Sequence, residues 1–396
     1  RRDMKKNNSS FFVISEFVDA NRNSTGYYWN KIIKGLSIEI ENLKVISTEK
    51  SNNLAKIDHP SVEYINIKTN DTYNKKSLFK RAFGQIRISI SFFFTIIKNV
   101  RKRDTIFSGT NPSFLLTFIA LSKVFFKFRW ILLVHDIFPE NLVASKIIPK
   151  KSFSYRCLSI LFNFIYSQSD DLIVIGKDMK VILNKKTNFK KDIKYIPNWV
   201  DLNDIDENNN KYIQDHRYLN FQFFGNIGRV QGIQFLLDGI SKVTNHRARF
   251  VFTGSGSDVE SVNEYIKTNK KNNVFLNPPI QFDENDSELF NCDIAIISLA
   301  KGMKGLAVPS KAYFSMAADK PILVIGEEES ELHELLQSHD SLGWFVLNNR
   351  CEDLGKRIDQ LCEIDLSIYK GYPKRIAAEN FEYKNAIKMY LKIINE

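Results

Sequence analysis

The stretch from Gly302 to Leu323, GMKGLAVPSKAYFSMAADKPIL, combines residue types that bind an anion. It lies between two short apolar runs, CDIAIISL and PILVI, so we predict a strand, a glycine-containing loop, a helix and a second strand. The free backbone N–H groups at the start of such a helix attract anions. Pro309, Ser310 and Lys311 begin the predicted helix, where Ser310 could cap it and Lys311 adds a positive charge. The alternative is an ordinary loop with a surface lysine.

Two other glycine loops follow predicted strands in the same half of the chain, FFGNIGRVQG and FTGSGS. Their spacing is not GxGxxG, which disfavours a dinucleotide site. Loops that follow the parallel strands of one sheet meet at one edge, as a diphosphate site requires. No carboxylate cluster stands nearby at metal-like spacing, so backbone amides and cations would neutralise the diphosphate. The candidate phosphate-binding residues are Gly225, Asn226, Arg229, Gln231, Gly254, Pro309, Ser310 and Lys311.

A second set of candidates lies in the first half of the chain. The apolar run RWILLV ends directly in His135 and Asp136, and Glu140 follows. Ligands of an open α/β sheet bind beyond the carboxyl ends of its strands, so these titratable groups stand where chemistry is expected. The alternatives are a satisfied histidine at a strand end and a carboxylate that caps a turn. Gly26, in the loop after the strand FFVIS, either lets the backbone approach a ligand or forms a plain turn.

The elements that must position these residues alternate between strand and helix along the chain. This alternation predicts an α/β fold with parallel sheets. The polar stretch from Asp204 to Asp215, DIDENNNKYIQD, separates two such series. We therefore predict an N-terminal Rossmann-like domain over 1–203, a second over 204–375 with a cleft between them, and a final helix over 376–396.

The chain has 396 residues, and 56 Lys and Arg against 45 Asp and Glu give a net charge of +11. This length predicts two domains, and the charge calls for an anionic partner such as a membrane surface or a phosphorylated ligand. The four cysteines lack CxxC spacing, which argues against a zinc site and fits a reducing cytoplasm. No apolar run is long enough for a signal peptide or a membrane span, so we expect a cytoplasmic protein.

The segment from Lys75 to Arg103 carries much of the positive charge and no acidic residue. Between its basic residues lies IRISISFFFTIIK, which is apolar but too short to cross a bilayer. Such a segment can lie in an anionic membrane interface. The alternative is a buried helix with basic ends, and nucleic acid is disfavoured because no binding motif is present. The residues expected to face lipid headgroups are Lys80, Arg81, Arg87, Lys98 and Arg101.

Taken in order, several segments resemble those of GT-B glycosyltransferases. They are TNPSF, HDIFPENL, DDLIVIGKDMK, YIPNWVDL, FFGNIGRVQG, FTGSG, CDIAIISL and VPSKAYFSMAADKPIL. The chain is most similar to the family-four retaining enzymes of bacterial O-antigen, capsule and colanic-acid assembly, in particular the N-acetyl-fucosamine transferase subgroup. The resemblance implies a nucleotide-sugar in the C-terminal domain, an acceptor in the N-terminal one, no essential metal or cofactor, and a last helix that crosses back to the first domain.

The resemblance also assigns individual residues. His135 matches a histidine that approaches the donor sugar, and Gly26 matches a donor-side glycine. Many relatives carry Arg and Lys at the positions of Asn226 and Gln231, which leaves Arg229 and Lys311 as the candidate cations. The sequence departs from the family pattern in two places. Leu306 and Phe314 occupy the positions of a Glu-x7-Glu pattern whose second Glu holds the ribose, and Asp319 replaces the usual glycine.

The predicted function is retaining transfer of a hexosyl or N-acetylhexosaminyl group from a nucleoside-diphosphate sugar, with UDP favoured, to a polyprenyl-pyrophosphate-linked saccharide. Lys311 would stabilise the departing diphosphate, His135 would orient the donor sugar, and Asp136 or Glu140 would position or deprotonate the acceptor hydroxyl. We expect a peripheral protein on the cytoplasmic face of the inner membrane. The alternatives are a UDP-sugar 2-epimerase of the same fold and a catalytically silent scaffold in a polysaccharide-assembly complex.

Overall fold

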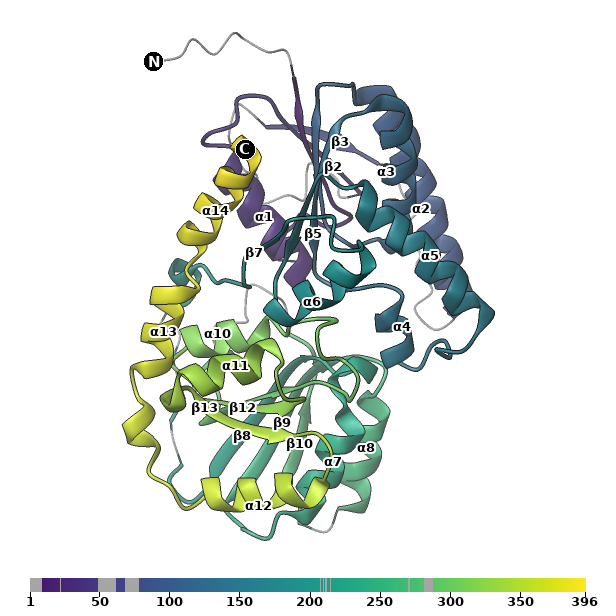
Figure 1. The fold of residues 1–396 in the computed structure, drawn as a ribbon. Helices are drawn as coiled ribbons and strands as arrows, with labels where there is room; N and C mark the ends of the chain where they lie inside the picture. Colours follow the sequence, from purple (N-terminus) through teal and green to yellow (C-terminus); the bar gives the residue numbers. More distant parts are fainter. Residues whose placement is uncertain are drawn as a thin grey trace.

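The structure, a computed structural model, describes residues 9–21, 23–48, 62–67, 78–206, 208, 210, 212–213, 215–269, 271–280 and 288–396. The described chain forms two α/β domains stacked one above the other, with the last two helices running along one side of both (Figure 1). The predicted pair of α/β domains is therefore confirmed.

The N-terminal domain is built on a seven-stranded parallel sheet with the order β3-β2-β1-β4-β5-β6-β7. Its central strands are apolar and buried, as expected of a sheet that helices cover on both faces. The strands are β1 (Phe11–Ile14), β2 (Leu43–Ser47), β3 (Val62–Asn66), β4 (Thr105–Ser108), β5 (Arg129–Val134), β6 (Asp171–Val174) and β7 (Ile193–Tyr195). The helices are α1 (Ser24–Leu36), α2 (Leu78–Asn99), α3 (Ser113–Phe126), α4 (Glu140–Ala144), α5 (Phe153–Gln168) and α6 (Lys177–Lys186).

The C-terminal domain contains a six-stranded parallel sheet with the order β10-β9-β8-β11-β12-β13. Its strands are β8 (Leu219–Asn226), β9 (Ala248–Ser255), β10 (Val274–Asn277), β11 (Ile294–Ser298), β12 (Ile322–Gly326) and β13 (Gly343–Leu347). Its helices are α7 (Ile233–Lys242), α8 (Val259–Thr268), α10 (Lys311–Ala317), α11 (Glu331–Ser338) and α12 (Cys351–Leu361), followed by α13 (Tyr372–Asn380) and α14 (Tyr383–Asn395). The predicted boundary at 203/204 falls between β7 and β8.

Both sheets reverse their strand order once, between β1 and β4 in the first sheet and between β8 and β11 in the second. Ligands of open α/β sheets bind at such a reversal, beyond the carboxyl ends of the strands. Residues that follow β1 and β5, together with the ends of β8 and β9, line one shared cleft. The topology therefore directs the ligand-binding edges of both domains toward each other.

The chain crosses between the domains twice, and the two crossings lie side by side. Val200 N donates to Phe381 O over 2.9 Å, and Tyr383 N donates back to Val200 O over 3.0 Å. The prediction of one helix over 376–396 is wrong, because this pairing breaks it at Phe381 and Glu382 into α13 and α14. Helix α13 packs on α10, and α14 packs on α1 of the N-terminal domain. Figure 1 shows α14 beside α1.

The basic segment forms α2, which packs against α3. Ile88, Phe92 and Ile96 are buried on its inner face, whereas Arg87 and Lys98 are exposed. The inner face of α2 thus agrees with the alternative prediction of a buried helix, whereas its outer face is exposed to solvent. Lys75 and Lys76, and the side chains of Lys80 and Arg81, lie outside the described residues. Among the helices that the structure describes, none combines the length and hydropathy that crossing a membrane would require.

Candidate functional site

A cleft of about 940 Å³ opens between the two domains, and residues of both domains line it. Its volume lies in the range of ligand sites. Backbone contacts fix the two walls: Ile137 N donates to Leu306 O over 3.0 Å, and Asp136 forms an isolated antiparallel bridge with Ala307. Asn198 Nδ2 donates to Val308 O over 3.2 Å. These contacts bring the residues after β5 next to the loop that leads into α10.

Most of the residues predicted from the sequence meet in this cleft, although they come from distant parts of the chain. The lining includes His135, Asp136, Gly225, Asn226, Gln231, Gly254, Pro309, Ser310 and Lys311. The two halves of the predicted site, which the sequence could not place relative to each other, therefore share one cavity.

Two glycines shape the wall that the C-terminal domain contributes. Gly225 and Gly254 are paired across β8 and β9, and both have positive φ, of 106° and 151°. A Cβ on Gly254 would lie 1.8 Å from Gly225 O, so no side chain fits there. The strand ends thus present bare backbone to the cleft, as a site for a bulky anion needs.

Lys311 supplies a buried cation to the same wall. Its Nζ is buried without a hydrogen-bond partner among the described residues, and it lies 3.5 Å from the ring centroid of Phe223. Burial lowers the pKa of Lys311 from its ordinary 10.5 to about 7. A buried ammonium with no acceptor calls for an explanation, and an anionic ligand in the cleft would supply one. Ser310 stands at the N-cap of α10, but its side chain makes no capping bond, so the predicted cap is wrong.

His135 and Asp136 form the titratable part of the opposite wall. Burial lowers the pKa of His135 to about 4, so its imidazole is neutral at pH 7. Burial raises the pKa of Asp136 to about 6, although a hydrogen bond from Asn141 Nδ2 to Asp136 Oδ1, 2.9 Å long, acts in the opposite direction. Asp136 is consequently a carboxylate at pH 7 that accepts a proton more readily than an exposed aspartate.

Three predicted residues do not line the cleft. Glu140 accepts hydrogen bonds from Lys186 Nζ at 2.8 Å and from Tyr155 at 3.3 Å, because α4, α5 and α6 converge there. Arg229 is exposed on a short 3₁₀ turn. Gly26 lies in the first turn of α1, where a Cβ would come 2.1 Å from Asp19 O. The chain's own backbone therefore requires glycine at 26, and a contact between Gly26 and the donor stays a prediction.

The sequence prediction missed a polar cluster on the N-terminal side of the cleft. Lys31 Nζ donates to Asp201 and Asp204, each over 2.7 Å, and Tyr27 donates to Asp204 Oδ2 over 2.9 Å. Burial opposes the charge of Lys31, but its bonds to the two carboxylates outweigh burial and raise its pKa. Lys31, Tyr27 and Asp204 all line the cleft. The spacing of Tyr27 and Lys31, four residues apart on one helical face, was the available signal.

The two departures from the family pattern have distinct structural consequences. Phe314 lines the cleft, and its ring centroid lies 5.3 Å from that of Tyr27. Asp319 has the left-handed φ of 57° that suits the usual glycine. Its carboxylate accepts a hydrogen bond of 2.8 Å from Gly371 N, at the N-cap of α13. Asp319 thus anchors the helix that leads to the second domain crossing.

The described residues contain no group of three or more His, Cys, Asp or Glu side chains placed to hold a metal ion. The expectation that the reaction needs neither a metal nor a cofactor remains a prediction.

Comparisons with known proteins place the chain among glycosyltransferases. Residues 219–363 match the family model described as Glycosyl transferases group 1. Over 376 residues the chain is 38% identical to a Pseudomonas aeruginosa protein named Probable glycosyltransferase WbjE, and the match covers 93% of this chain and 94% of that protein.

Solved structures give the same fold. Anabaena Alr3699/HepE in complex with UDP has a TM-score of 0.68 and 13% identity, over 98% of this chain and 99% of that chain. WaaG, a glycosyltransferase involved in lipopolysaccharide biosynthesis, has a TM-score of 0.67 and 9% identity, over 96% of this chain and 98% of that chain. The predicted GT-B architecture is confirmed.

Proposed function

The chain belongs to the group 1 glycosyltransferases, and we propose that it moves a hexosyl or N-acetylhexosaminyl group from a nucleoside-diphosphate sugar to a polyprenyl-pyrophosphate-linked saccharide. The reaction retains the anomeric configuration and belongs to the synthesis of a bacterial surface polysaccharide, either O-antigen or capsule. The observation that carries the proposal is Lys311, which lines a cleft between the two domains and whose buried Nζ has no hydrogen-bond partner among the residues that the structure describes.

The donor is bound on the side of the C-terminal domain. Its diphosphate lies against the bare backbone of Gly225 and Gly254, with Lys311 as the neutralising cation. Asn226 and Gln231 line the same wall and offer neutral amide donors. UDP is favoured as the nucleotide because the similarly folded HepE was solved in complex with UDP.

In the reaction, the bond between the anomeric carbon and the diphosphate oxygen breaks, and a bond from the same carbon to an acceptor hydroxyl oxygen forms. The leaving diphosphate gains negative charge, which the ammonium of Lys311 stabilises most strongly at that moment. Asp136 takes the proton of the attacking hydroxyl group or holds that hydroxyl in place. Neutral His135 orients the donor sugar. Glu140 takes no part in this step, because it forms an ion pair with Lys186.

The ribose needs an acceptor of hydrogen bonds that Phe314 does not provide. Asp204 is the candidate, because its carboxylate lines the cleft and Tyr27 joins it to Phe314. Each carboxylate oxygen has more than one lone pair, so the bonds from Tyr27 and Lys31 leave capacity for ribose hydroxyls. Asp204→Asn keeps the shape and weakens this acceptor, so nucleotide affinity should fall about tenfold.

The lipid-linked acceptor and a peripheral location at the inner membrane complete the proposal. Their support is the net charge of +11 and the likeness in fold to WaaG, which is named as a lipopolysaccharide enzyme.

The test is transfer of a labelled sugar from UDP-, GDP- and dTDP-sugars to lipid-linked saccharides extracted from bacterial membranes. Wild-type protein should label the lipid fraction with one donor, and Lys311→Met should reduce labelling at least tenfold. If Lys311→Met stayed within about threefold of wild type, its assigned role would be wrong. Donor binding without any transfer would favour a silent scaffold, and isomerisation of free UDP-sugar would favour the epimerase.

A further inference from the structure

The outer helical layer of the N-terminal domain is free of negative charge. Helices α2, α3 and α5 contain no Asp or Glu. From residue 78 to residue 168 the chain has three acidic residues, Asp104, Asp136 and Glu140. Asp104 accepts hydrogen bonds from the backbone N–H groups of Ser10 and Arg101, Asp136 lines the cleft, and Glu140 is paired with Lys186. The face of this layer is therefore neutral or basic throughout.

The same layer exposes large apolar side chains. Phe94 on α2 is 65% exposed, Phe125 on α3 is 77% exposed, and Phe153 and Ile160 on α5 are 81% and 72% exposed. More than half of the exposed large hydrophobic side chains in the described chain lie on these three helices and on the loop before α5. An apolar face of this kind on a water-soluble domain marks a surface that another phase or molecule covers.

The three helices form one continuous surface. Helix α2 packs on α3 and α3 packs on α5, and the rings of Phe93 and Phe118 join the first two at a centroid distance of 5.3 Å. Figure 1 shows the three helices together along one side of the N-terminal domain. The exposed apolar residues are thus parts of one face and not scattered singly.

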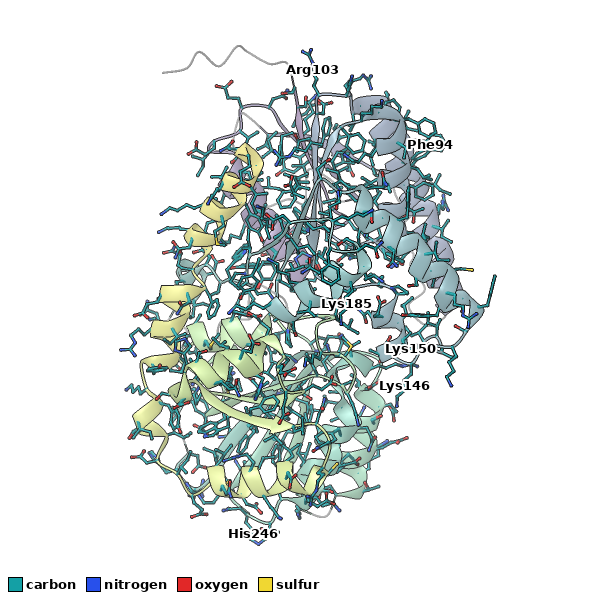
Figure 2. The ribbon with its side chains drawn as sticks, viewed as in Figure 1. Phe94, Arg103, Lys146, Lys150, Lys185 and His246 are labelled. Atoms are coloured by element: carbon teal, nitrogen blue, oxygen red, sulfur yellow. The ribbon has the colours of Figure 1, made fainter. Side chains whose placement is uncertain are left out.

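Basic residues border this face at the end nearest the cleft. The loop before α5 carries Lys146, Lys150 and Lys151, which are exposed and make no ion pair within the described chain. In Figure 2, Lys146 and Lys150 lie at the level where the two domains meet, and Phe94 lies at the outer edge of the N-terminal domain. Arg101 is less available, because its guanidinium donates to the carbonyls of Lys98 and Val100 at the end of α2.

We propose that the outer face of α2, α3 and α5, with residues 145–152, docks on an anionic lipid bilayer. Phe125, Phe153 and Ile160 enter the boundary between headgroups and acyl chains, and the lysines of the loop meet lipid phosphates. A second copy of this chain is disfavoured as the occupant, since a two-fold contact through this face would bring basic side chains of both copies together. This proposal rests on the proposed function, in which the acceptor is linked to a lipid. A protein docked through this face would hold that lipid beside the cleft.

The experiment measures binding of the full chain to sedimented vesicles of phosphatidylcholine alone or with about 30% phosphatidylglycerol, a content chosen to represent an anionic surface. Wild-type protein should bind the anionic vesicles, and raised salt should weaken binding. The double variant Phe125→Ser/Phe153→Ser should bind at least tenfold more weakly. The side chains of Lys150 and Lys151 are exposed, so Lys150→Glu/Lys151→Glu removes no packing contact of the core. This variant should also bind at least tenfold more weakly.

Matched variants on the C-terminal domain serve as controls. Ile368 is 71% exposed and Lys356 is exposed on α12, so Ile368→Ser and Lys356→Glu should leave vesicle binding unchanged. Equal loss in both sets, or equal binding of wild type to neutral and anionic vesicles, would overturn the proposal. A dimer of the wild type in lipid-free buffer that Phe125→Ser/Phe153→Ser dissociates would instead assign the face to a second copy.

Transfer to a soluble, short-chain acceptor separates this proposal from the proposed function. The surface variants should retain that activity, because none of these residues lines the cleft. Loss of vesicle binding with retained transfer supports the docking face. An enzyme without any transfer that still binds anionic vesicles through this face would contradict the proposed function and leave the docking proposal standing.

Discussion

At the scale of single residues, burial moves two opposite charges of the cleft toward neutrality. The pKa of Lys311 falls to about 7 and that of Asp136 rises to about 6. An anionic ligand beside Lys311 favours its charged form and raises its pKa again. Nucleotide binding should therefore be coupled to the uptake of a proton.

This coupling predicts how nucleotide affinity depends on pH. Below about pH 7 Lys311 is already charged, so binding is at full strength. Above that pH each bound nucleotide must take up a proton, and Kd should rise about tenfold per pH unit until the pKa of the bound state is reached. Calorimetric titration with UDP between pH 6 and pH 9 measures this slope. Lys311→Met should bind weakly with a flat profile, whereas Arg229→Gln, outside the cleft lining, should keep both the affinity and the slope.

Asp136 and His135 make different predictions for the rate of transfer. The acidic limb of kcat/KM should have an apparent pKa of about 6, because Asp136 acts as a carboxylate and is lost on protonation. Asp136→Asn should reduce kcat about a hundredfold and remove this limb. His135→Gln should reduce the rate but leave the limb in place, since His135 titrates only near pH 4. If the acidic limb disappeared in His135→Gln, His135 and not Asp136 would be the group whose protonation ends the reaction.

At the scale of elements, the wall of the donor site depends on the paired ends of β8 and β9. Gly254→Ala would press a methyl group into Gly225 O, so we expect a loss of roughly 1–3 kcal/mol in stability and weaker nucleotide binding. Gly326→Ala, at the end of β12, is the matched control. Its Cβ would come no closer than 3.9 Å to Phe345, and stability should stay within about 1 kcal/mol of wild type. Thermal unfolding and UDP titration of both variants provide the comparison.

The alternation of apolar runs was sufficient to predict parallel strands that alternate with helices, because parallel strands covered on both faces must be continuously apolar. It also placed His135 and Asp136 at a strand end, and Lys311 at the start of a helix that follows a strand and its loop, where ligands bind. Contacts between distant segments could not be predicted in this way. The last helix is interrupted at Phe381 because the backbone there pairs with Val200. Glu140 does not line the cleft, because it is bonded to Lys186. The need for glycine at 26 could not be predicted in this way either, because it depends on the close approach of Asp19 O in the preceding loop.

At the scale of the whole molecule, each domain caps a helix of the other. Glu331 of α11 accepts a 2.6 Å hydrogen bond from Lys177 N at the start of α6, and another from Tyr195. In return, Asp178 of α6 accepts bonds from Gly305 N at 2.9 Å and Glu331 N at 3.3 Å. These reciprocal bonds hold the wall of the cleft that contains the loop before α10.

Loss of one cap should loosen the two domains. Glu331→Ala removes the acceptor of two partly buried hydrogen bonds, from Lys177 N and Tyr195, which should cost about 1–3 kcal/mol in total. We expect a lower Tm and faster proteolysis between the domains. Glu334→Ala, an exposed neighbour on α11, should leave both unchanged. An unaltered Tm in Glu331→Ala would show that the reciprocal caps do not stabilise the domain contact.

The central claim is that the interdomain cleft binds a nucleoside-diphosphate sugar through Lys311. Its most direct test is calorimetric titration of wild type and Lys311→Met with UDP-, GDP- and dTDP-sugars at pH 6.5, where Lys311 is largely protonated. We predict that wild type binds at least one of these donors and that Lys311→Met binds it about 10–100-fold more weakly, as expected for loss of a charge-assisted contact. Binding of none of them by the wild type, or equal affinity in the two proteins, would contradict the account.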